Sequence, residues 1–259
     1  MIRRLLVIAG SDSSAGAGLQ ADLKTAQRFG VYAQTAVTAV TVQNTSGIRA
    51  IQAMPPDIVR AQIQAALGDI GADAIKIGML ANAAIAAVVA DALMETSIPV
   101  VLDPVLVSTS GRMLLDRAGV EILKNRLLPR AMLVTPNLPE CEALVGVSPT
   151  NDGAIRQAAQ AFALLGAKHV LFKGGHGDGT MARDVLAGVD GKLLIFQSPR
   201  QDTPHTHGTG CVLSTAIACG LAKGMEIGES VRQAHAFVQE AIRTAPGLGR
   251  GHGPLNFNT

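Results

Sequence analysis

The stretch Pro204-His205-Thr206-His207-Gly208-Thr209-Gly210-Cys211 runs directly into an apolar segment, residues 212–218. Gly208 and Gly210 have no Cβ, so the backbone of this loop can approach a ligand closely. The first amides of the helix expected next have no acceptor within that helix and lie at the positive end of its dipole. The stretch therefore predicts an anion site, most often for phosphate. Cys211 lies where loop becomes helix, which predicts a lowered pKa for its thiol. The alternative is an ordinary glycine-rich turn before a buried helix.

The composition predicts one globular α/β domain over residues 1–259. Hydrophobic residues make up 48% of the chain and charged residues 16%, which argues against a disordered protein. A net charge of +2 and an aromatic content of 3% argue against a nucleic-acid-binding surface. The first apolar run is shorter than the core of a signal peptide, and no stretch approaches the ~20 apolar residues of a membrane span. We therefore expect no membrane partner.

The cysteines indicate the compartment. Cys141, Cys211 and Cys219 are an odd number and show no C-x-x-C spacing. This pattern argues against a disulfide framework or a zinc site and fits a reducing cytoplasm.

Segments typical of strands and of helices alternate along the chain. Strands are expected at 5–9, 35–42, 74–80, 99–105, 132–137 and 168–176, with a hairpin at 185–195 that turns at Asp190-Gly191. Helices are expected at 19–29, 57–68, 83–94 and 154–166, directly after Cys211, and at 227–244. The alternation predicts a doubly wound, mainly parallel sheet with helices on both faces, ending in a Gly/Pro-rich tail at 247–259.

The first expected strand ends in a glycine-containing loop, Gly10 to Gly18, that opens a helix. Such a unit also suggests the dinucleotide site of an oxidoreductase. That signal is weak, because Gly16-Ala17-Gly18 is followed by Gln20-Ala21 instead of a third glycine. The acid expected about 20 residues later is also missing, since residues 38–45 carry no charge.

Five motifs occur in a characteristic order and spacing along the chain. They are Ser13–Asp22, Asp103–Gly111, Thr135–Glu140, Lys173–His176 and His205–Cys211. Together they resemble the hydroxymethylpyrimidine/phosphomethylpyrimidine kinases of the ribokinase superfamily, and the resemblance extends from Gly10 to about Gly253. Two positions are notable. Ala15 stands where these kinases usually have glycine, and Cys211 stands where most sugar and nucleoside kinases of the superfamily have Asp.

The resemblance implies a pyrimidine pocket formed by Gly10, Asp22, Gln43, Met79 and Val105. Gln43 matches the position that hydrogen-bonds the aminopyrimidine, and a carboxamide suits this task because it offers a donor beside an acceptor. Without the resemblance, Asp22 would be interpreted as a solvated acid in the first turn of a helix. Gln43 would then be a surface turn residue and Met79 a core residue.

The resemblance also implies sites for ATP and Mg²⁺. Asp103 lies at the carboxyl end of an expected buried strand, where ligands gather in open α/β sheets. Glu140 ends the N-x-x-E motif, whose acid acts on Mg²⁺; the alternative is an ordinary acid in the first turn of a helix. Asn137, Lys173 and Thr209 are then expected to contact the nucleotide, with Lys173 reaching a phosphate.

The implied activity is the phosphorylation of 4-amino-5-hydroxymethyl-2-methylpyrimidine to its monophosphate and then to its diphosphate, in thiamine biosynthesis. The amides from Gly208 to Gly210 would hold the charge of the transferring group, and Cys211 would take the hydroxyl proton as general base. Pyridoxal kinase activity and a non-catalytic vitamin-binding protein remain alternatives on the same fold. A homodimer is expected from the resemblance alone.

Overall fold

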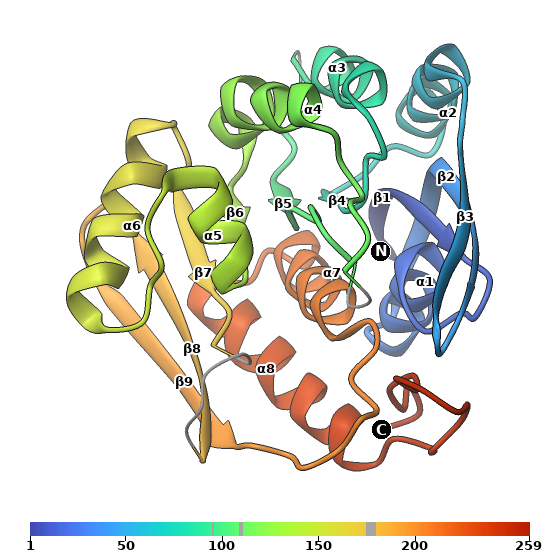
Figure 1. Cartoon of the computed structure of the whole chain (residues 1–259). Helices are drawn as coiled ribbons and strands as arrows, with labels where there is room; N and C mark the ends of the chain where they lie inside the picture. Colours follow the sequence, from blue (N-terminus) through green and yellow to red (C-terminus); the bar gives the residue numbers. More distant parts are fainter. Residues whose placement is uncertain (95, 109–110, 175–179) are drawn as a thin grey trace.

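The computed structural model describes residues 1–94, 96–108, 111–174 and 180–259, and its centre is one continuous β-sheet (Figure 1). Within these residues the sheet has nine strands in the order β3-β2-β1-β4-β5-β6-β7-β8-β9. The strands are β1 (Arg3–Asp12), β2 (Val31–Asn44), β3 (Gly47–Ala53), β4 (Ala74–Ile77), β5 (Val100–Leu102), β6 (Leu133–Val134), β7 (His169–Phe172), β8 (Met181–Gly188) and β9 (Leu193–Pro199).

The six neighbouring strands β2, β1, β4, β5, β6 and β7 are parallel to one another. At the two edges, β3 pairs antiparallel with β2, β8 with β7, and β9 with β8. The central strands are short apolar runs because helices cover both of their faces. From β1 the chain moves first to β2 on one side and later to β4 on the other. The carboxyl ends of β1 and β4 therefore lie at the point where the strand order reverses, and such a point forms a crevice for ligands.

Helices cover both faces of the sheet. They are α1 (Gly18–Arg28), α2 (Pro56–Gly68), α3 (Ala83–Ala92), α4 (Arg117–Ile122), α5 (Leu138–Val145), α6 (Asp152–Leu164), α7 (Thr209–Ala222) and α8 (Ile227–Arg243). A π-helical turn, η1 (Leu123–Leu127), and a 3₁₀ turn, η2 (Leu128–Arg130), extend α4. Figure 1 shows α2, α3 and α4 on one side of the sheet and α7 and α8 on the other.

Each face of the sheet has its own apolar core. Alternate residues of β1 belong to different cores, since Leu6 and Ile8 pack with α2 to α6 while Leu5 and Val7 pack with α1, α7 and α8. Helix α7 is buried along almost its whole length, so it is apolar on all sides rather than amphipathic.

The predicted fold class is confirmed: the sheet is mainly parallel, both faces carry helices, and the hairpin that turns at Asp190-Gly191 is present. Three features differ from the predictions. The turn expected after Gln43 leads into an antiparallel edge strand, β3, because β2 continues to Asn44 and folds back on itself. The helices α4 and α5 were not expected from the sequence. The tail at 247–259 packs back on the body of the protein, where Leu255 is buried and Pro254 bridges to His207.

Candidate active site

A cavity of about 730 Å³ opens at the carboxyl ends of the parallel strands, a size typical of small-molecule sites. Residues from both ends of the chain line it. The predicted site residues that line it are Gly10, Gln43, Met79, Asp103, Val105, Asn137, Glu140, Lys173, Gly208, Thr209, Gly210 and Cys211. The structure therefore brings together in one cavity all of the predicted site residues except Asp22.

The end of the cavity predicted to hold the pyrimidine lies at the strand-order reversal. The register of β1 against β2 shifts between Ala9 and Ser11, so Gly10 sits in a bulge. A Cβ on Gly10 would lie 3.0 Å from Met79 Sδ, so a larger residue there would require the Met79 side chain to shift. Gln43, near the end of β2, lines the same space. Backbone, thioether and carboxamide thus form one partly apolar wall.

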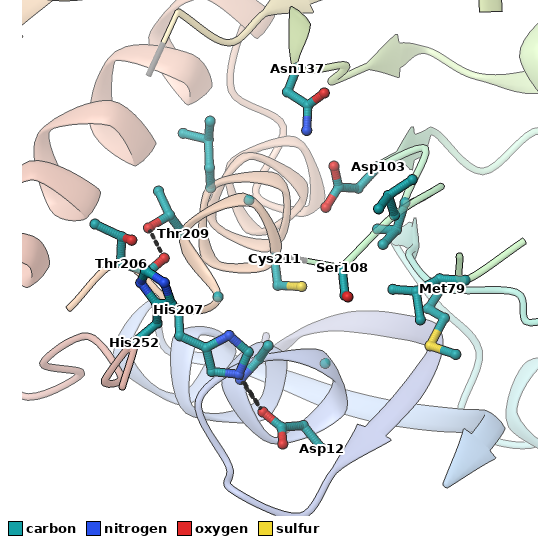
Figure 2. A pocket seen from close by; sticks show the side chains of 18 of the residues that line it. Asp12, Met79, Asp103, Ser108, Asn137, Thr206, His207, Thr209, Cys211 and His252 are labelled. Carbon is teal, nitrogen blue, oxygen red and sulfur yellow. Dashed lines mark hydrogen bonds and ion pairs between the residues drawn. The ribbon is translucent and has the colours of Figure 1, made fainter. Parts of the chain in front are cut away.

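The loop before α7 has the conformation that an anion site needs. Gly208 has φ +86°, and a Cβ there would overlap the carbonyl oxygen of Gly16. Only glycine fits, so the two glycine loops of the chain pack directly against each other. Thr209 Oγ1 donates to the carbonyl of Thr206 at 2.7 Å and so closes the turn (Figure 2). Gly210 lies next to the charged groups, since a Cβ there would be 3.2 Å from Lys173 Nζ.

Cys211 lies at the start of α7, and Figure 2 shows its sulfur pointing into the pocket. The predicted lowering of its pKa is wrong. Burial raises the pKa of this thiol to about 11 and outweighs the attraction of the Lys76 ammonium; the carboxylates of Asp22 and Asp103 raise it further. The amide of Gly18, at the start of α1, also faces the sulfur. Cys211 is therefore a neutral thiol at neutral pH.

An open charge cluster consists of Asp103, Glu140 and Lys173. Lys173 Nζ lies 2.9 Å from Asp103 Oδ1 and 3.7 Å from Glu140 Oε2. Thr135 Oγ1 donates to Asp103 at 3.0 Å, and Ser214 Oγ lies 3.5 Å from the other carboxylate oxygen. Burial opposes ionisation of Asp103, but Lys173 and Lys76 lower its pKa overall. Burial and the nearby Asp103 raise the pKa of Glu140.

The N-x-x-E motif forms a capping box at the start of α5. The Asn137 side chain accepts from the Glu140 amide at 2.8 Å, and Glu140 Oε2 accepts from the Asn137 amide at 2.9 Å. Glu140 is thus a first-turn helix acid and also part of the open charge cluster. The two interpretations offered by the sequence are compatible, because the oxygen Oε2 that caps the helix is also the one that faces Lys173.

Asp22 does not line the cavity, contrary to the prediction. It is fully buried beneath the cavity floor in a sealed charge cluster with Lys76 and Thr215. Lys76 Nζ lies 3.0 and 2.9 Å from the two Asp22 oxygens, and Thr215 Oγ1 donates to Asp22 at 2.6 Å. Burial alone would lower the pKa of Lys76, but the contact with Asp22 raises it. The interpretation of Asp22 as a solvated acid is also wrong.

Three residues at the site did not follow from the sequence reasoning. Lys76 lines the cavity from within β4, and its signal was a lone lysine in an otherwise apolar strand. His207 is buried and contacts Asp12. His207 belongs to the His205–Cys211 motif, but nothing in that motif indicates its pairing with Asp12. His252 lines the cavity from the C-terminal tail, for which the sequence carried no signal. Parts of two motifs, Thr109-Ser110 and Gly175-His176, lie outside the described residues.

The fold and site define the class: a small-molecule kinase with a ribokinase-like fold. The family model for phosphomethylpyrimidine kinase matches residues 12–256. Hydroxymethylpyrimidine/phosphomethylpyrimidine kinase of Haemophilus influenzae is 45% identical, over 98% of this chain and 96% of its own. The chain belongs to the phosphomethylpyrimidine kinase family.

Two solved structures are similar to this chain. An ADP complex of Bacillus subtilis pyridoxal kinase has a TM-score of 0.90 and 35% identity, covering 99% of this chain and 98% of that one. Phosphomethylpyrimidine kinase from Clostridium difficile has a TM-score of 0.82 and 38% identity, covering 93% of this chain and 99% of that one. Within the part of this chain that the structure describes, no helix is both long and apolar enough to cross a membrane.

Proposed function

We propose that this chain phosphorylates 4-amino-5-hydroxymethyl-2-methylpyrimidine and then its monophosphate, with ATP as donor, in thiamine biosynthesis. One observation carries the proposal. A single cavity is lined both by the open charge cluster and the anion loop and by the Gln43–Met79 wall. The first set of groups suits phosphates and the second a small polar ring. The likeness to the ADP complex of a pyridoxal kinase supports ATP as the donor.

The chain's own residues position the reacting groups and stabilise charge. Phosphoryl transfer needs in-line alignment and neutralisation of the transferring group more than covalent participation. The amides of Gly210 and Cys211 have no acceptors within α7, so they can hold the equatorial oxygens, whereas the Thr209 amide already donates to the carbonyl of Thr206 at 3.3 Å. Lys173 lies beside Gly210 and can pair with a phosphate when it leaves Asp103. Thr209 and Asn137 border the same space.

The two acids of the open charge cluster fit a magnesium site. Both face one cation, Lys173, which shows that the cluster already balances a positive charge at this point. Mg²⁺ takes few carboxylates and keeps several waters, so Asp103 and Glu140 are an adequate donor set. The bound ion would neutralise charge on the phosphates. Lys173 would then be available for a phosphate oxygen.

Cys211 acts as the proposed general base only late in the reaction. Since its thiol is neutral, Cys211 can accept the hydroxyl proton only after the thiol has released its own proton to solvent, so the thiolate that acts as base is a minor form at pH 7. Cys211→Ala should reduce kcat by about 10²-fold with a small change in KM. Full turnover of Cys211→Ala would remove the base role but leave the anion loop intact.

Compartment and assembly complete the proposal. We place the protein in the cytoplasm, which the three free cysteines support because they form no disulfide. We also propose a homodimer on the basis of the family resemblance. Light scattering coupled to size exclusion should give twice the chain mass of 26.7 kDa, and a mass equal to one chain would contradict the dimer.

Product analysis tests the main proposal. The protein is incubated with ATP, Mg²⁺ and the hydroxymethylpyrimidine, and the products are separated and weighed by mass spectrometry. The pyrimidine diphosphate is the expected product. Monophosphate alone would contradict the second step, and no pyrimidine product would contradict the function.

Pyridoxal kinase activity is the second candidate, because a pyridoxal kinase shares the fold at a TM-score of 0.90. Pyridoxal also carries a hydroxymethyl group on a flat heteroaromatic ring. The Gln43 carboxamide favours the aminopyrimidine, which presents a donor beside an acceptor. The ratio of kcat/KM for the two substrates decides between the candidates.

A further inference from the structure

His207 lies between Asp12 and Gln43 at the wall of the cavity. Its Nε2 atom is 2.9 Å from Asp12 Oδ2 (Figure 2). Gln43 Nε2 lies 3.2 Å from the same His207 Nε2, and Gln43 Oε1 lies 3.2 Å from Thr41 Oγ1. His207 is 8% exposed and Asp12 3% exposed, so water does not compete freely for these contacts.

The surroundings of Asp12 require it to be an acceptor. Its carboxylate accepts from the amides of Ser14 at 2.8 Å, Ala17 at 2.9 Å and Gly16 at 3.2 Å, as well as from the Ser14 hydroxyl. Burial opposes ionisation, but the hydrogen bonds from His207, Ser14 and Ala17 outweigh it and lower the pKa of Asp12 to about 2. An ionised carboxylate has no proton to give. The proton of the His207–Asp12 contact therefore sits on Nε2.

That proton decides which end of Gln43 faces His207. An Nε2 atom that carries a proton cannot also accept one, so the Gln43 amide fits its neighbours only when its two ends are exchanged and its oxygen lies beside His207. Thr41 gives the same answer independently. Its oxygen lies 3.0 Å from the Ser11 carbonyl and 3.2 Å from Gln43 Oε1, and its single proton cannot serve both acceptors. With the two ends of the amide exchanged, Thr41 donates to Ser11 and accepts from the Gln43 NH₂ group. One arrangement of protons satisfies all four residues.

The His207 ring is also held in place mechanically. A Cβ on Gly16 would lie 2.6 Å from His207 Cδ2, so the glycine provides the space for the ring. The main-chain amide of His207 donates to the carbonyl of Gly253 at 3.1 Å. The ring therefore has little freedom to turn away from Gln43, and Asp12 fixes the position of its proton.

We propose that His207, held by Asp12, is a positioning residue that locks the Gln43 carboxamide in one orientation and thereby selects the substrate edge. This inference rests on the proposed function. Beside its hydroxymethyl group, the pyrimidine presents an amino donor followed by a ring-nitrogen acceptor. Pyridoxal presents an aldehyde acceptor followed by a hydroxyl. The two edges need opposite orders of oxygen and NH₂, so a carboxamide that cannot turn discriminates between them, and one that can turn does not.

The protonation of His207 in the wild type is the first test and needs no substrate. Two-dimensional NMR of ¹⁵N-histidine-labelled protein distinguishes a protonated ring nitrogen from a bare one. His207→Ala identifies the signals. A proton on Nε2 at pH 7 supports the proposed chain of contacts from Asp12 through His207 to Gln43, here called the relay. A bare Nε2 overturns it, because Gln43 would then present its NH₂ group to His207.

The second test is the ratio of kcat/KM for the pyrimidine to that for pyridoxal. His207→Ala should lower this ratio about tenfold, the value of one oriented hydrogen bond. His207→Gln should retain most of the ratio, because its amide nitrogen can replace Nε2. His169→Ala is the matched control, since His169 lies on β7 and contacts Met132 instead of the cavity. An unchanged ratio in His207→Ala would overturn the role in selection.

A double-mutant cycle separates the relay from general damage to the loop. In a Gln43→Leu background, His207→Ala should have no further effect on the ratio. An equal loss with and without Gln43 would show that His207 acts through the loop, and would overturn the relay. A wild type that does not phosphorylate the pyrimidine overturns the proposed function and the selection role together. A bare Nε2 in an active wild type overturns the relay alone.

Discussion

Two charge clusters lie under the start of α7, and they contain similar groups in very different surroundings. The sealed charge cluster pairs Lys76 with Asp22, and both side chains are 0% exposed. The open charge cluster pairs Lys173 with Asp103, with Lys173 14% exposed and facing the cavity. Lys76 also borders the cavity but is not exposed to it, so the exposure of the lysine, rather than the type of residue, decides which pair can exchange its partner for a ligand.

Adjacent residues of α7 connect the helix to both clusters. Ser214 approaches Asp103, and Thr215 donates to Asp22. Water cannot take the place of either partner in the sealed pair, so the loss of one partner should lower the free energy of unfolding. In the open pair, Lys173 can exchange Asp103 for a phosphate and Asp103 can exchange Lys173 for a metal ion, so the loss of this pair should reduce turnover. Four predictions test this contrast.

The largest effect is expected from Lys76→Met. It leaves the buried Asp22 carboxylate without its cation and with only the Thr215 hydroxyl as a partner, and should lower the free energy of unfolding by about 3–5 kcal/mol in urea titrations. Lys192→Met is the matched control, because Lys192 is 84% exposed in its pair with Asp190 and should contribute little. The double variant Asp22→Asn/Lys76→Met should recover part of the loss. Wild-type stability in Lys76→Met would contradict a structural role for the sealed pair.

Asp103→Asn should act mainly on turnover. We expect kcat to fall by about 10²–10³-fold, because a group that organises charge at the reacting phosphates is lost. Stability should change less than in Lys76→Met, since Lys173 keeps Glu140 and can reach the cavity. Steady-state kinetics at several Mg²⁺ concentrations, together with urea titrations, measure both quantities. A large loss of stability with normal kcat would reverse the contrast between the clusters.

Cys211 lies between the two clusters, so the rate of its alkylation should depend on the charges of both. With a pKa of about 11, the thiol should react slowly with iodoacetamide at pH 7. The rate should rise about tenfold per pH unit up to pH 9.5. Because the folded pKa exceeds the unfolded one, this thiol stabilises the fold below the unfolded pKa, and the contribution is lost as pH rises toward 11.

Peptide mass spectrometry follows the modification of each cysteine separately. Cys141 and Cys219 are internal controls, since burial raises the pKa of each to about 12. Lys76→Met should slow the reaction of Cys211, because an attraction that favours its thiolate is removed. A rate that is already constant at pH 7 would mean that the thiolate is formed there, in conflict with the burial of the sulfur.

The smallest effect concerns Ala15, close to the helix that carries Asp22. Its φ is +59°, a left-handed conformation in which alanine is strained. Ala15→Gly should therefore raise the free energy of unfolding by about 0.5–1 kcal/mol after the entropy cost of glycine is subtracted, with unchanged kcat. Thermal unfolding measures the gain. Ala161→Gly within α6 should instead destabilise, and a loss in both variants would contradict strain at Ala15.

Much of the fold could be predicted from local patterns. The alternation of apolar runs and helical segments, read along the chain, predicts the parallel sheet because each pattern reports which faces of an element are buried. The edge strand β3 was missed because its residues are half-buried or exposed and carry no such pattern. The helix α5 was not among the expected helices because its capping signal, Asn137 to Glu140, was interpreted mainly as a nucleotide and metal site, with a first-turn helix acid only as the alternative.

The sequence by itself determined the class of site. Gly208 must be glycine because of its backbone conformation and its contact with Gly16, and glycines leave a readable mark in a sequence. Asp103 and Lys173 could be predicted because each directly follows a strand, and Glu140 because it ends the N-x-x-E motif. Tertiary structure alone decided the sealing of Asp22, the neutral thiol of Cys211 and the pairing of His207 with Asp12. These properties depend on desolvation and on contacts between residues up to 195 positions apart, and a local pattern carries neither.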